Sequence, residues 1–234
     1  MFIDWRNRCT PVKDQGNCGS CVGFGTIAAI EALINIKYGI VKILSEAQPF
    51  FCAGANCEEG AYVPDVLDQE SITWIPTAQE NHYVDHNVPC YKGKATGAIL
   101  TKWYLLDNAE EMKIALTSGP IVGTMEVHES FMHYVSGVYH SLGPQDHVVG
   151  GHCICIVGYD DAKGAWLVKN SWGTGWGERG YVWIKYGDSE IEVESYSVFP
   201  IIPTLPEPPT PKYECWFKSF LSNLYRALTG HGGD

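Results

Sequence analysis

The sequence predicts an α+β protein with two unlike lobes, one helical and one built from strands. Apolar residues recur at helical spacing through much of the first half, whereas short extended apolar runs dominate from residue 120 onward. Helices followed by strands along one chain are typical of α+β folds, in which the two kinds of element occupy separate regions. Ligand sites tend to lie in the cleft between such regions, so we expect functional residues from both lobes.

The strongest predicted helix covers residues 20–38. Isoleucine and leucine side chains repeat there at helical spacing, small residues occupy the other faces, and Gly39 is a natural stop. A helix that is apolar around most of its circumference is typically buried. Three further helices are predicted at residues 45–52, 63–69 and 108–116. Residues 1–19 and most of 53–100 are predicted as loops because turn-forming residues are frequent there.

Strands account for most of the second half. The predicted extended segments are residues 121–127, 137–139, 152–159, 164–172, 181–185 and 195–199, and a short helical turn is predicted at 130–134. The apolar run at 152–159 is typical of a buried strand, with 164–172 as its hairpin partner. We therefore expect an antiparallel sheet in this lobe.

Composition and charge limit the class of function. The formal charge of −11 and the pI of about 5.1 argue against nucleic acid as a partner. Nine cysteines in 234 residues indicate an oxidising, extracytoplasmic compartment, and their odd number leaves at least one thiol free if every disulfide is internal. A zinc site is the alternative, but the short cysteine pairs make no four-ligand set, so we expect no metal and no cofactor.

The stretch Gln15–Phe24 carries the strongest chemical signal. A glycine-rich turn leads there directly into the long predicted helix and places Cys21 at or next to its first turn. The positive end of the helix dipole favours an anion at this position and lowers the pKa of a thiol. A thiol nucleophile also needs a base and a group that orients the base. His152 and Asn170, which lie about 130 and 150 residues downstream, are the candidates.

Each of these residues has a plainer interpretation when taken alone. A single cysteine on a buried helix is usually inert packing, and a histidine before a strand or an asparagine in a turn is usually structural. The motifs around them reverse that expectation. They are Cys18-Gly19-Ser20-Cys21, Gly150-Gly151-His152 and the run from Lys169 to Tyr181, together with Asp4-Trp5-Arg6, the run from Thr10 to Gly16, and Leu44-Ser45-Glu46.

In these motifs, which are spread over most of residues 4–200, the chain resembles the papain-like cysteine peptidases. It looks most like their cathepsin B and cathepsin L branches. The resemblance implies a papain-like two-lobe fold for residues 1–200, with a helical left lobe at about 7–105. An antiparallel, β-barrel-like right lobe would cover about 106–200 together with the N-terminal residues, and the active-site cleft would lie between the lobes.

The family's catalytic roles carry over to four residues. Cys21 matches the nucleophile, held as a thiolate beside the imidazolium of His152, and Asn170 matches the side chain that orients the imidazole. Gln15 matches the donor that stabilises the oxyanion together with the backbone N–H of Cys21. We therefore expect a cysteine endopeptidase that works through an acyl-enzyme. The alternatives are a catalytically weak or inactive binding module with this fold, and a transpeptidase that uses the same acyl-enzyme.

The resemblance also implies how a peptide is bound. The residues that it places at the substrate are Gly60, Glu59, Thr124, Gly151, Trp172 and Glu192. Gly60 would pair with the substrate backbone, and Trp172 would keep water off the asparagine–histidine contact. Thr124 and Gly151 would wall the pocket for the second substrate residue. Glu192 would give that pocket an acidic floor that accepts a basic as well as an apolar side chain, and the alternative for Glu192 is a solvated acidic strand edge.

Two positions depart from the family pattern. Val22 follows the nucleophile where the family has Trp or Tyr, and Glu59 replaces a glycine, which narrows the cleft wall or adds negative charge to it. The interval from Cys57 to Cys90 lacks the length and the spare cysteine pair of an occluding loop, so we expect an open cleft.

By resemblance the disulfides are Cys18–Cys57 and Cys52–Cys90. Cys153 and Cys155 lie two residues apart on one predicted strand and face the same side, so we expect them to be buried free thiols. A bond between Cys9 and Cys215 is the remaining pairing.

We expect a monomer that acts on peptide or protein substrates, with a pro-segment or a protein inhibitor as further partners and a secreted or lysosome- or vacuole-like location. Residues 201–211 are predicted to form a proline-rich linker. Residues 212–234 are predicted to form an amphipathic helix and a flexible tail. We expect this helix to dock on the peptidase rather than to bind another partner or a membrane surface.

Overall fold

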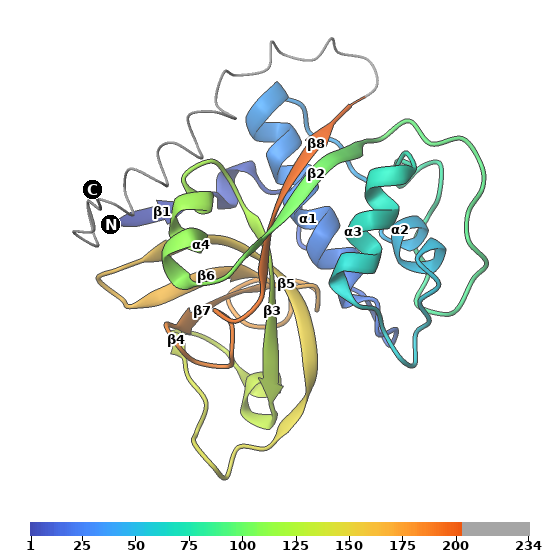
Figure 1. Ribbon diagram of the computed structural model, residues 1–234. Helices are drawn as coiled ribbons and strands as arrows, with labels where there is room; N and C mark the ends of the chain where they lie inside the picture. Colours follow the sequence, from blue (N-terminus) through green and yellow to red (C-terminus); the bar gives the residue numbers. More distant parts are fainter. Residues whose placement is uncertain (203–234) are drawn as a thin grey trace, which may run out of the picture. The chain divides into compact units, whose positions relative to one another are not determined.

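The computed structural model describes residues 1–202 (Figure 1). The predicted tail helix and all but the first two residues of the predicted linker lie outside the described residues. We call α1 to α3 with their loops the helical half, and the sheet with α4 the sheet half.

Helices α1 to α3 pack against one another on one side of the molecule, whereas α4 packs on the sheet (Figure 1). The helical elements are η1 (Arg6–Arg8), α1 (Cys21–Tyr38), α2 (Ala47–Cys52), α3 (Val63–Ile72), α4 (Ala109–Leu116) and η2 (Glu129–His133). Each helix that the sequence predicts within the described residues is present, with its ends displaced by a few residues at most.

The strands form an eight-stranded sheet. They are β1 (Phe2–Asp4), β2 (Ile99–Leu106), β3 (Ile121–His128), β4 (Val138–Tyr139), β5 (Val148–Asp160), β6 (Ala165–Lys169), β7 (Tyr181–Lys185) and β8 (Ser195–Ile201). Their order is β2-β8-β3-β5-β6-β7-β4, and β1 pairs with β5. The pairs are antiparallel except for β4 with β7, and β5 and β6 form the predicted hairpin.

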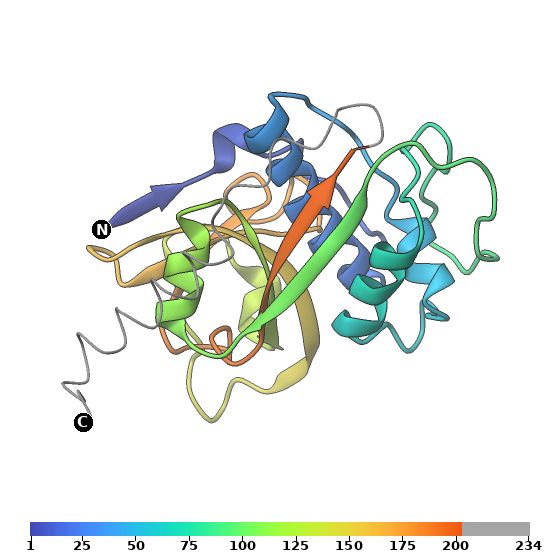
Figure 2. The same cartoon turned by 45° about the horizontal axis from the view of Figure 1, so that its top comes forward.

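The sheet does not close into the β-barrel-like lobe that the resemblance implies. Its order begins at β2 and ends at β4, and among the described strands no pairing joins these two ends. β2 and β8 pair as a long ribbon that runs toward the helices and contacts α3 and α1 (Figures 1 and 2). The ribbon therefore connects the sheet half to the helical half instead of completing a barrel.

Two strands were not predicted from the sequence. β1 has three residues, which is too short for a periodic pattern. It lies so close to β5 that a Cβ atom added at Gly158 would lie 2.0 Å from the carbonyl oxygen of Ile3. β2 has apolar residues along most of its length, and its exposed and buried positions do not alternate. In this ribbon the contacts with α3 determine which side chains are buried, so buried and exposed residues do not alternate along β2.

α1 is the central helix of the molecule. It ends at Gly39, which has a left-handed φ of 67° and donates its backbone N–H to the carbonyl of Asn35 at 2.9 Å. It packs tightly on β5 at Gly25, where an added Cβ atom would lie 2.6 Å from Sγ of Cys153. Among the described helices α1 is the one long and apolar enough to cross a membrane, but 72% of it is buried inside the protein, as in a core helix.

The cysteines divide between the two halves. The structure contains the disulfides Cys18–Cys57 and Cys52–Cys90, both in the helical half. Cys153 and Cys155 are buried thiols on β5. Cys9 forms no disulfide with any described residue, and its predicted partner Cys215 lies outside that part of the chain.

A buried carboxyl group joins α3 to α1. Glu70 is fully buried, its Oε1 accepts a hydrogen bond of 2.7 Å from Oγ1 of Thr26, and its Oε2 has no partner among the described residues. Burial raises the pKa of this carboxyl from 4.5 to about 8 and outweighs the opposing effect of the Thr26 hydrogen bond. The folded protein therefore keeps a proton on Glu70 over a pH range in which the unfolded chain has lost it.

We predict that Glu70→Gln makes stability less sensitive to rising pH. The native pKa lies above the unfolded value, so the folded state loses up to about 5 kcal/mol of stability as the pH rises from 4.5 to 8. Near pH 5 the variant and the wild type should have similar free energies of unfolding, whereas at pH 8 the variant should be more stable. Urea unfolding at both pH values measures this.

The matched control is Glu110→Gln, which removes a carboxylate at an exposed position of α4. Its pH profile should follow that of the wild type. If Glu70→Gln also followed the wild type at every pH, Glu70 would not be the group that loses its proton.

Candidate active site

Three chain segments bring the predicted catalytic residues to one cleft. Cys21 is the first residue of α1, His152 lies on β5, and Asn170 directly follows β6. β5 and β6 are hydrogen-bonded neighbours, and α1 packs against β5. The cleft has a volume of about 670 Å³, and its lining includes Gln15, Cys21, His152 and Trp172. Residues far apart in the sequence therefore face one space.

The surroundings of Cys21 favour a thiolate. It occupies the first turn of α1, where backbone N–H groups are unpaired within the helix and no acidic residue is present. Burial raises the pKa of the thiol, but the hydrogen bond and charge of His152, with the backbone N–H groups of Cys153 and Val22, outweigh burial and lower that pKa. Burial also disfavours the charged form of His152 and so lowers its pKa. The hydrogen bond and charge of Cys21 outweigh burial, and the pKa of His152 is raised. Each of the two groups therefore favours the charged form of the other, thiolate for Cys21 and imidazolium for His152.

Asn170 fixes the orientation of the imidazole. Its Oδ1 lies 2.8 Å from Nε2 of His152 and also accepts a hydrogen bond of 2.8 Å from the backbone N–H of Ser171. Because Nε2 is used in this contact, Nδ1 is the ring nitrogen left for Cys21. The indole of Trp172 covers the imidazole, with the ring centroids 4.9 Å apart and the planes at 32°. Both His152 and Asn170 are buried, so bulk water does not compete for their hydrogen bond.

The side-chain amide of Gln15 is held in one orientation. Its Nε2 donates to the carbonyl of Cys18 at 2.9 Å, and its Oε1 accepts from Oγ of Ser171 at 2.6 Å. A carbonyl oxygen can only accept, so the first bond identifies the nitrogen. Nε2 carries two hydrogens, and the second remains available for a ligand in the cleft.

A buried hydrogen-bond network connects β6, the strand before Asn170, to α1. The ammonium group of Lys169 donates to the carbonyl of Thr10 at 2.9 Å, and Oγ1 of Thr10 donates to the carboxylate of Glu31 on α1. Thr10, Glu31 and Lys169 are all buried, so water cannot replace a hydrogen bond that is lost between them. The network therefore fixes the position of the sheet half against the helix that carries the nucleophile.

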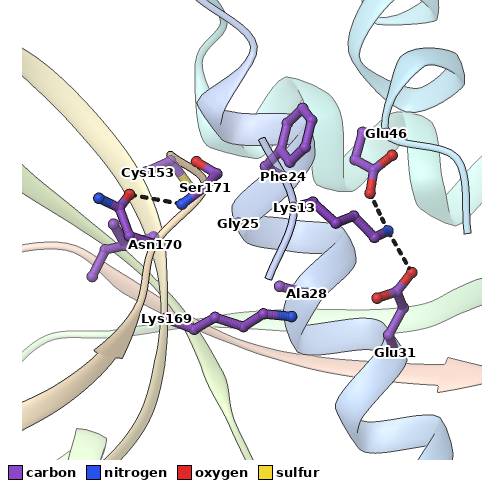
Figure 3. Close-up of a pocket in the computed structure, with 11 residues that line it drawn as sticks. Lys13, Phe24, Gly25, Ala28, Glu31, Glu46, Cys153, Lys169, Asn170 and Ser171 are labelled. Carbon is purple, nitrogen blue, oxygen red and sulfur yellow. Dashed lines mark hydrogen bonds and ion pairs between the residues drawn. The ribbon is translucent and has the colours of Figure 1, made fainter. Parts of the chain in front are cut away.

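Lys13 extends this network to the start of α2. It lies between Glu31, at 2.7 Å, and Glu46, and these side chains border a small buried cavity of about 10 Å³ (Figure 3). Burial lowers the pKa of Lys13, but the two carboxylates outweigh burial and raise it. Burial raises the pKa of Glu46 more than Lys13 lowers it. Burial and the charge of Glu31 therefore leave Glu46 with a raised pKa, although it shares the ammonium group of Lys13.

The predicted substrate-binding residues come from both halves. Glu59 and Gly60 belong to the loop before α3, Thr124 to β3 and Gly151 to β5, and all four line the cleft. Gly60 has a left-handed φ of 77°, and its N–H donates to the carbonyl of Asn56 at 2.9 Å. Its N–H is therefore used within the loop, which leaves the carbonyl oxygen of Gly60 as the group for a peptide.

Glu192 is not among the residues that line the cleft, so its predicted place in the pocket is wrong. Its Oε1 accepts hydrogen bonds from Nε1 of Trp166 and from the backbone N–H of Gly187, both at 2.9 Å. The prediction assumed a strand with alternating faces, but the segment is a turn in which Ser189 and Glu190 each have a φ of 53°. Alternation therefore does not decide which side chains face the cleft.

Four carboxylates that the sequence did not predict also line the cleft. They are Glu58, Glu126, Glu190 and Glu194. Glu126 shares a face of β3 with Thr124, so strand alternation could have identified it. Glu190 and Glu194 depend on the turn before β8, for which the sequence carries no local pattern.

The chain is similar to known cysteine proteases over most of its length. Residues 1–201 match the family model described as papain family cysteine protease. The chain is 33% identical to ananain of Ananas comosus over 218 residues, which are 89% of this chain and 62% of that protein. It is 33% identical to cathepsin K of Gallus gallus over 192 residues, which are 77% of this chain and 57% of that protein.

Among solved structures, the chain is similar to the bromelain protease from Ananas comosus in complex with the E64 inhibitor. The TM-score is 0.73 and the sequence identity 27%, and the match covers 85% of this chain and 98% of that chain. The chain spans about 60% of the full length of the relatives ananain and cathepsin K.

We predict that the thiol of Cys21 reacts with a neutral alkylating agent such as iodoacetamide at a pH well below its ordinary pKa of 9.0. The reaction rate should rise with pH through the lowered pKa of Cys21 and reach a plateau. Removing the imidazolium by His152→Ala leaves burial to raise the pKa, so at pH 6 the rate should fall by roughly 10³-fold. Intact mass spectrometry over time gives the rates.

Asn170→Ala is the intermediate case, because it loosens the imidazole without removing it. Its rate profile should lie between those of the wild type and His152→Ala. An unchanged profile in His152→Ala would contradict the thiolate–imidazolium pair.

Proposed function

Because the chain belongs to the papain family of cysteine proteases, we propose that it hydrolyses internal peptide bonds of polypeptide substrates. The observation that supports this most directly is the thiol of Cys21 beside the imidazole of His152 in a cleft of about 670 Å³. A cleft of this size holds a ligand of several residues. Covalent catalysis requires a reactive thiolate at the surface of the cleft that is oriented toward the bound ligand.

In the proposed reaction the thiolate of Cys21 attacks the carbonyl carbon of the scissile bond, and the C=O electron pair moves to the oxygen. The backbone N–H of Cys21 and the remaining N–H of Gln15 donate to this oxyanion. The imidazolium of His152 gives its Nδ1 proton to the leaving amine, and the C–N bond breaks to leave a thioester. Neutral His152 then takes a proton from a water molecule that attacks the thioester, and the thiolate leaves.

The same proposal assigns the substrate contacts. Gly60 pairs with the peptide backbone, and Thr124 and Gly151 wall the pocket for the second residue on the acyl side. Glu194 takes the place in this pocket that the sequence assigned to Glu192. Support comes from the cleft lining, which includes Glu194 but not Glu192.

The alternative of an inactive binding module rests on Val22 and Glu59, and the comparisons do not favour it. Val22 is buried and packs into the same core as Ile27 and Ile30. Nothing in the packing of α1 therefore argues against a working thiol.

We also propose an oxidising compartment, either secreted or lysosome- or vacuole-like. Two disulfides in the helical half support this, because such bonds form and persist outside reducing compartments. Peptides and proteins are the proposed substrates. A monomeric state and a pro-segment or protein inhibitor as partner stay predictions.

We predict that Gln15→Ala lowers kcat by roughly 10²–10³-fold with little change in KM, because it removes a donor that acts on the developing oxyanion. Steady-state kinetics with a fluorogenic dipeptidyl-arginine substrate measures this. Alkylation of Cys21 in the variant should keep the wild-type rate, since the thiolate does not depend on that donor. A fall in alkylation of the same size would instead mean that Gln15 holds the nucleophile in place.

Labelling with an epoxysuccinyl inhibitor tests the proposed function itself. We expect one adduct per chain, located on Cys21, and loss of both the adduct and peptide cleavage in Cys21→Ala. Intact mass and peptide mapping identify the site. Cleavage that survives in Cys21→Ala, or oxidised and folded protein that takes no adduct, would overturn the proposal.

A further inference from the structure

The walls of the cleft carry an excess of negative charge that no neighbouring cation balances. Five glutamates line the cleft, two from the helical half and three from the sheet half, and no lysine or arginine is among the described lining residues. The five are Glu58, Glu59, Glu126, Glu190 and Glu194. In the described part of the chain none of them takes part in an ion pair.

Some carboxylates elsewhere in the described residues are paired with a cation, which none of the five in the cleft is. Asp4 pairs with Arg6 at 2.6 Å, Glu31 with Lys13 at 2.7 Å, and Asp161 with Lys113 at 2.9 Å. Five like charges around one space repel one another, and a cleft with low-dielectric walls strengthens their common field. A cationic ligand would relieve this repulsion.

Neutral donors hold three of the five carboxylates in place without cancelling their charge. Glu58 accepts from Nδ2 of Asn87 at 2.8 Å, and Glu59 accepts from Nδ2 of Asn56 at 2.9 Å. On the sheet side the hydroxyl of Tyr196 donates to Glu194. These side chains are therefore positioned before a ligand arrives, which lowers the entropy cost of binding a cation.

A peptide bound along the cleft can reach the carboxylates of both halves with neighbouring side chains. An extended peptide that pairs with the loop at Gly60 points successive side chains to opposite sides. If one side chain enters the pocket beside Thr124 and Glu194 in the sheet half, its neighbour turns toward Glu58 and Glu59 in the helical half. Two adjacent side chains of such a peptide thus meet carboxylates from different halves.

We propose that the cleft selects cationic polypeptides, with basic side chains at two adjacent positions on the acyl side of the scissile bond. Glu194 recognises one of these side chains and Glu59, with Glu58, recognises the other. As a statement about substrates this rests on the proposed peptidase function, but the charge selection itself is a property of binding and is measured without catalysis.

The first experiment measures binding to Cys21→Ala, which keeps the cleft and removes the nucleophile. Labelled hexapeptides that carry Arg-Arg, Arg-Gln, Gln-Arg or Gln-Gln at the two central positions are titrated by fluorescence anisotropy. At low salt we expect Arg-Arg to bind at least roughly tenfold more tightly than Gln-Gln, with the single-arginine peptides between them. In 1 M NaCl, where the Debye length is about 3 Å, most of this preference should disappear.

Variants that replace a glutamate by glutamine test which wall of the cleft is responsible for the arginine preference at each position. In the Cys21→Ala background, Glu194→Gln should reduce the preference for arginine at one of the two positions by several-fold, and Glu59→Gln should reduce it at the other. Glu110→Gln on α4, which removes the same charge away from the cleft, is the matched control and should bind all four peptides like its parent. Equal affinity for the four peptides, or Glu194→Gln and Glu59→Gln indistinguishable from Glu110→Gln, would overturn the proposal.

The same peptides separate this inference from the proposed function. If wild-type protein takes the epoxysuccinyl label and cleaves Gln-Gln as well as Arg-Arg, the charge selection is wrong and the peptidase function stands. If no label forms and nothing is cleaved, but the arginine preference persists in binding, the peptidase function is wrong and the cationic ligand stands.

Discussion

Cys21 and His152 belong to different halves of the molecule, and each shifts the pKa of the other toward its charged form because the two side chains lie beside each other. Both groups are largely withdrawn from water, where an unpaired charge would be lost by proton transfer. The spacing between α1 and β5 is therefore a chemical property of the site. Gly25 sets it, because any side chain there would collide with Cys153.

The segment from Thr10 to Gln15 holds this spacing from the other side. Thr10 accepts a hydrogen bond from Lys169, the neighbour of Asn170, and donates one to Glu31 on α1. Gln15 bonds Ser171 through both its backbone and its side chain. Moving α1 relative to β6 would break several of these buried hydrogen bonds, at a cost of about 1–3 kcal/mol for each unsatisfied group.

The sequence predicted what depends on local patterns and missed what depends on long-range packing. α1 and the approach of Cys21, His152 and Asn170 were predicted because dense motifs surround each residue, although the catalytic roles themselves stay predictions. Glu192 was misplaced because its segment reads as a strand and folds as a turn with left-handed residues. β2 was missed because the β2–β8 ribbon packs on α3 and α1, and no short window contains these contacts. The barrel-like lobe was expected from the family resemblance, whereas the described strands form an open sheet.

The two disulfides lie wholly in the helical half, whereas the cysteines of β5 in the sheet half are buried thiols. A reductant therefore acts on the two halves unequally. It would release the loop that carries Glu59 and Gly60, and the turn that leads to Cys21, while the imidazole and its asparagine kept their supports. The redox state of the surroundings thus sets a window for the proposed activity. It must be oxidising enough to preserve the wall that carries Glu59 and Gly60, yet not so oxidising that the thiol of Cys21 is consumed.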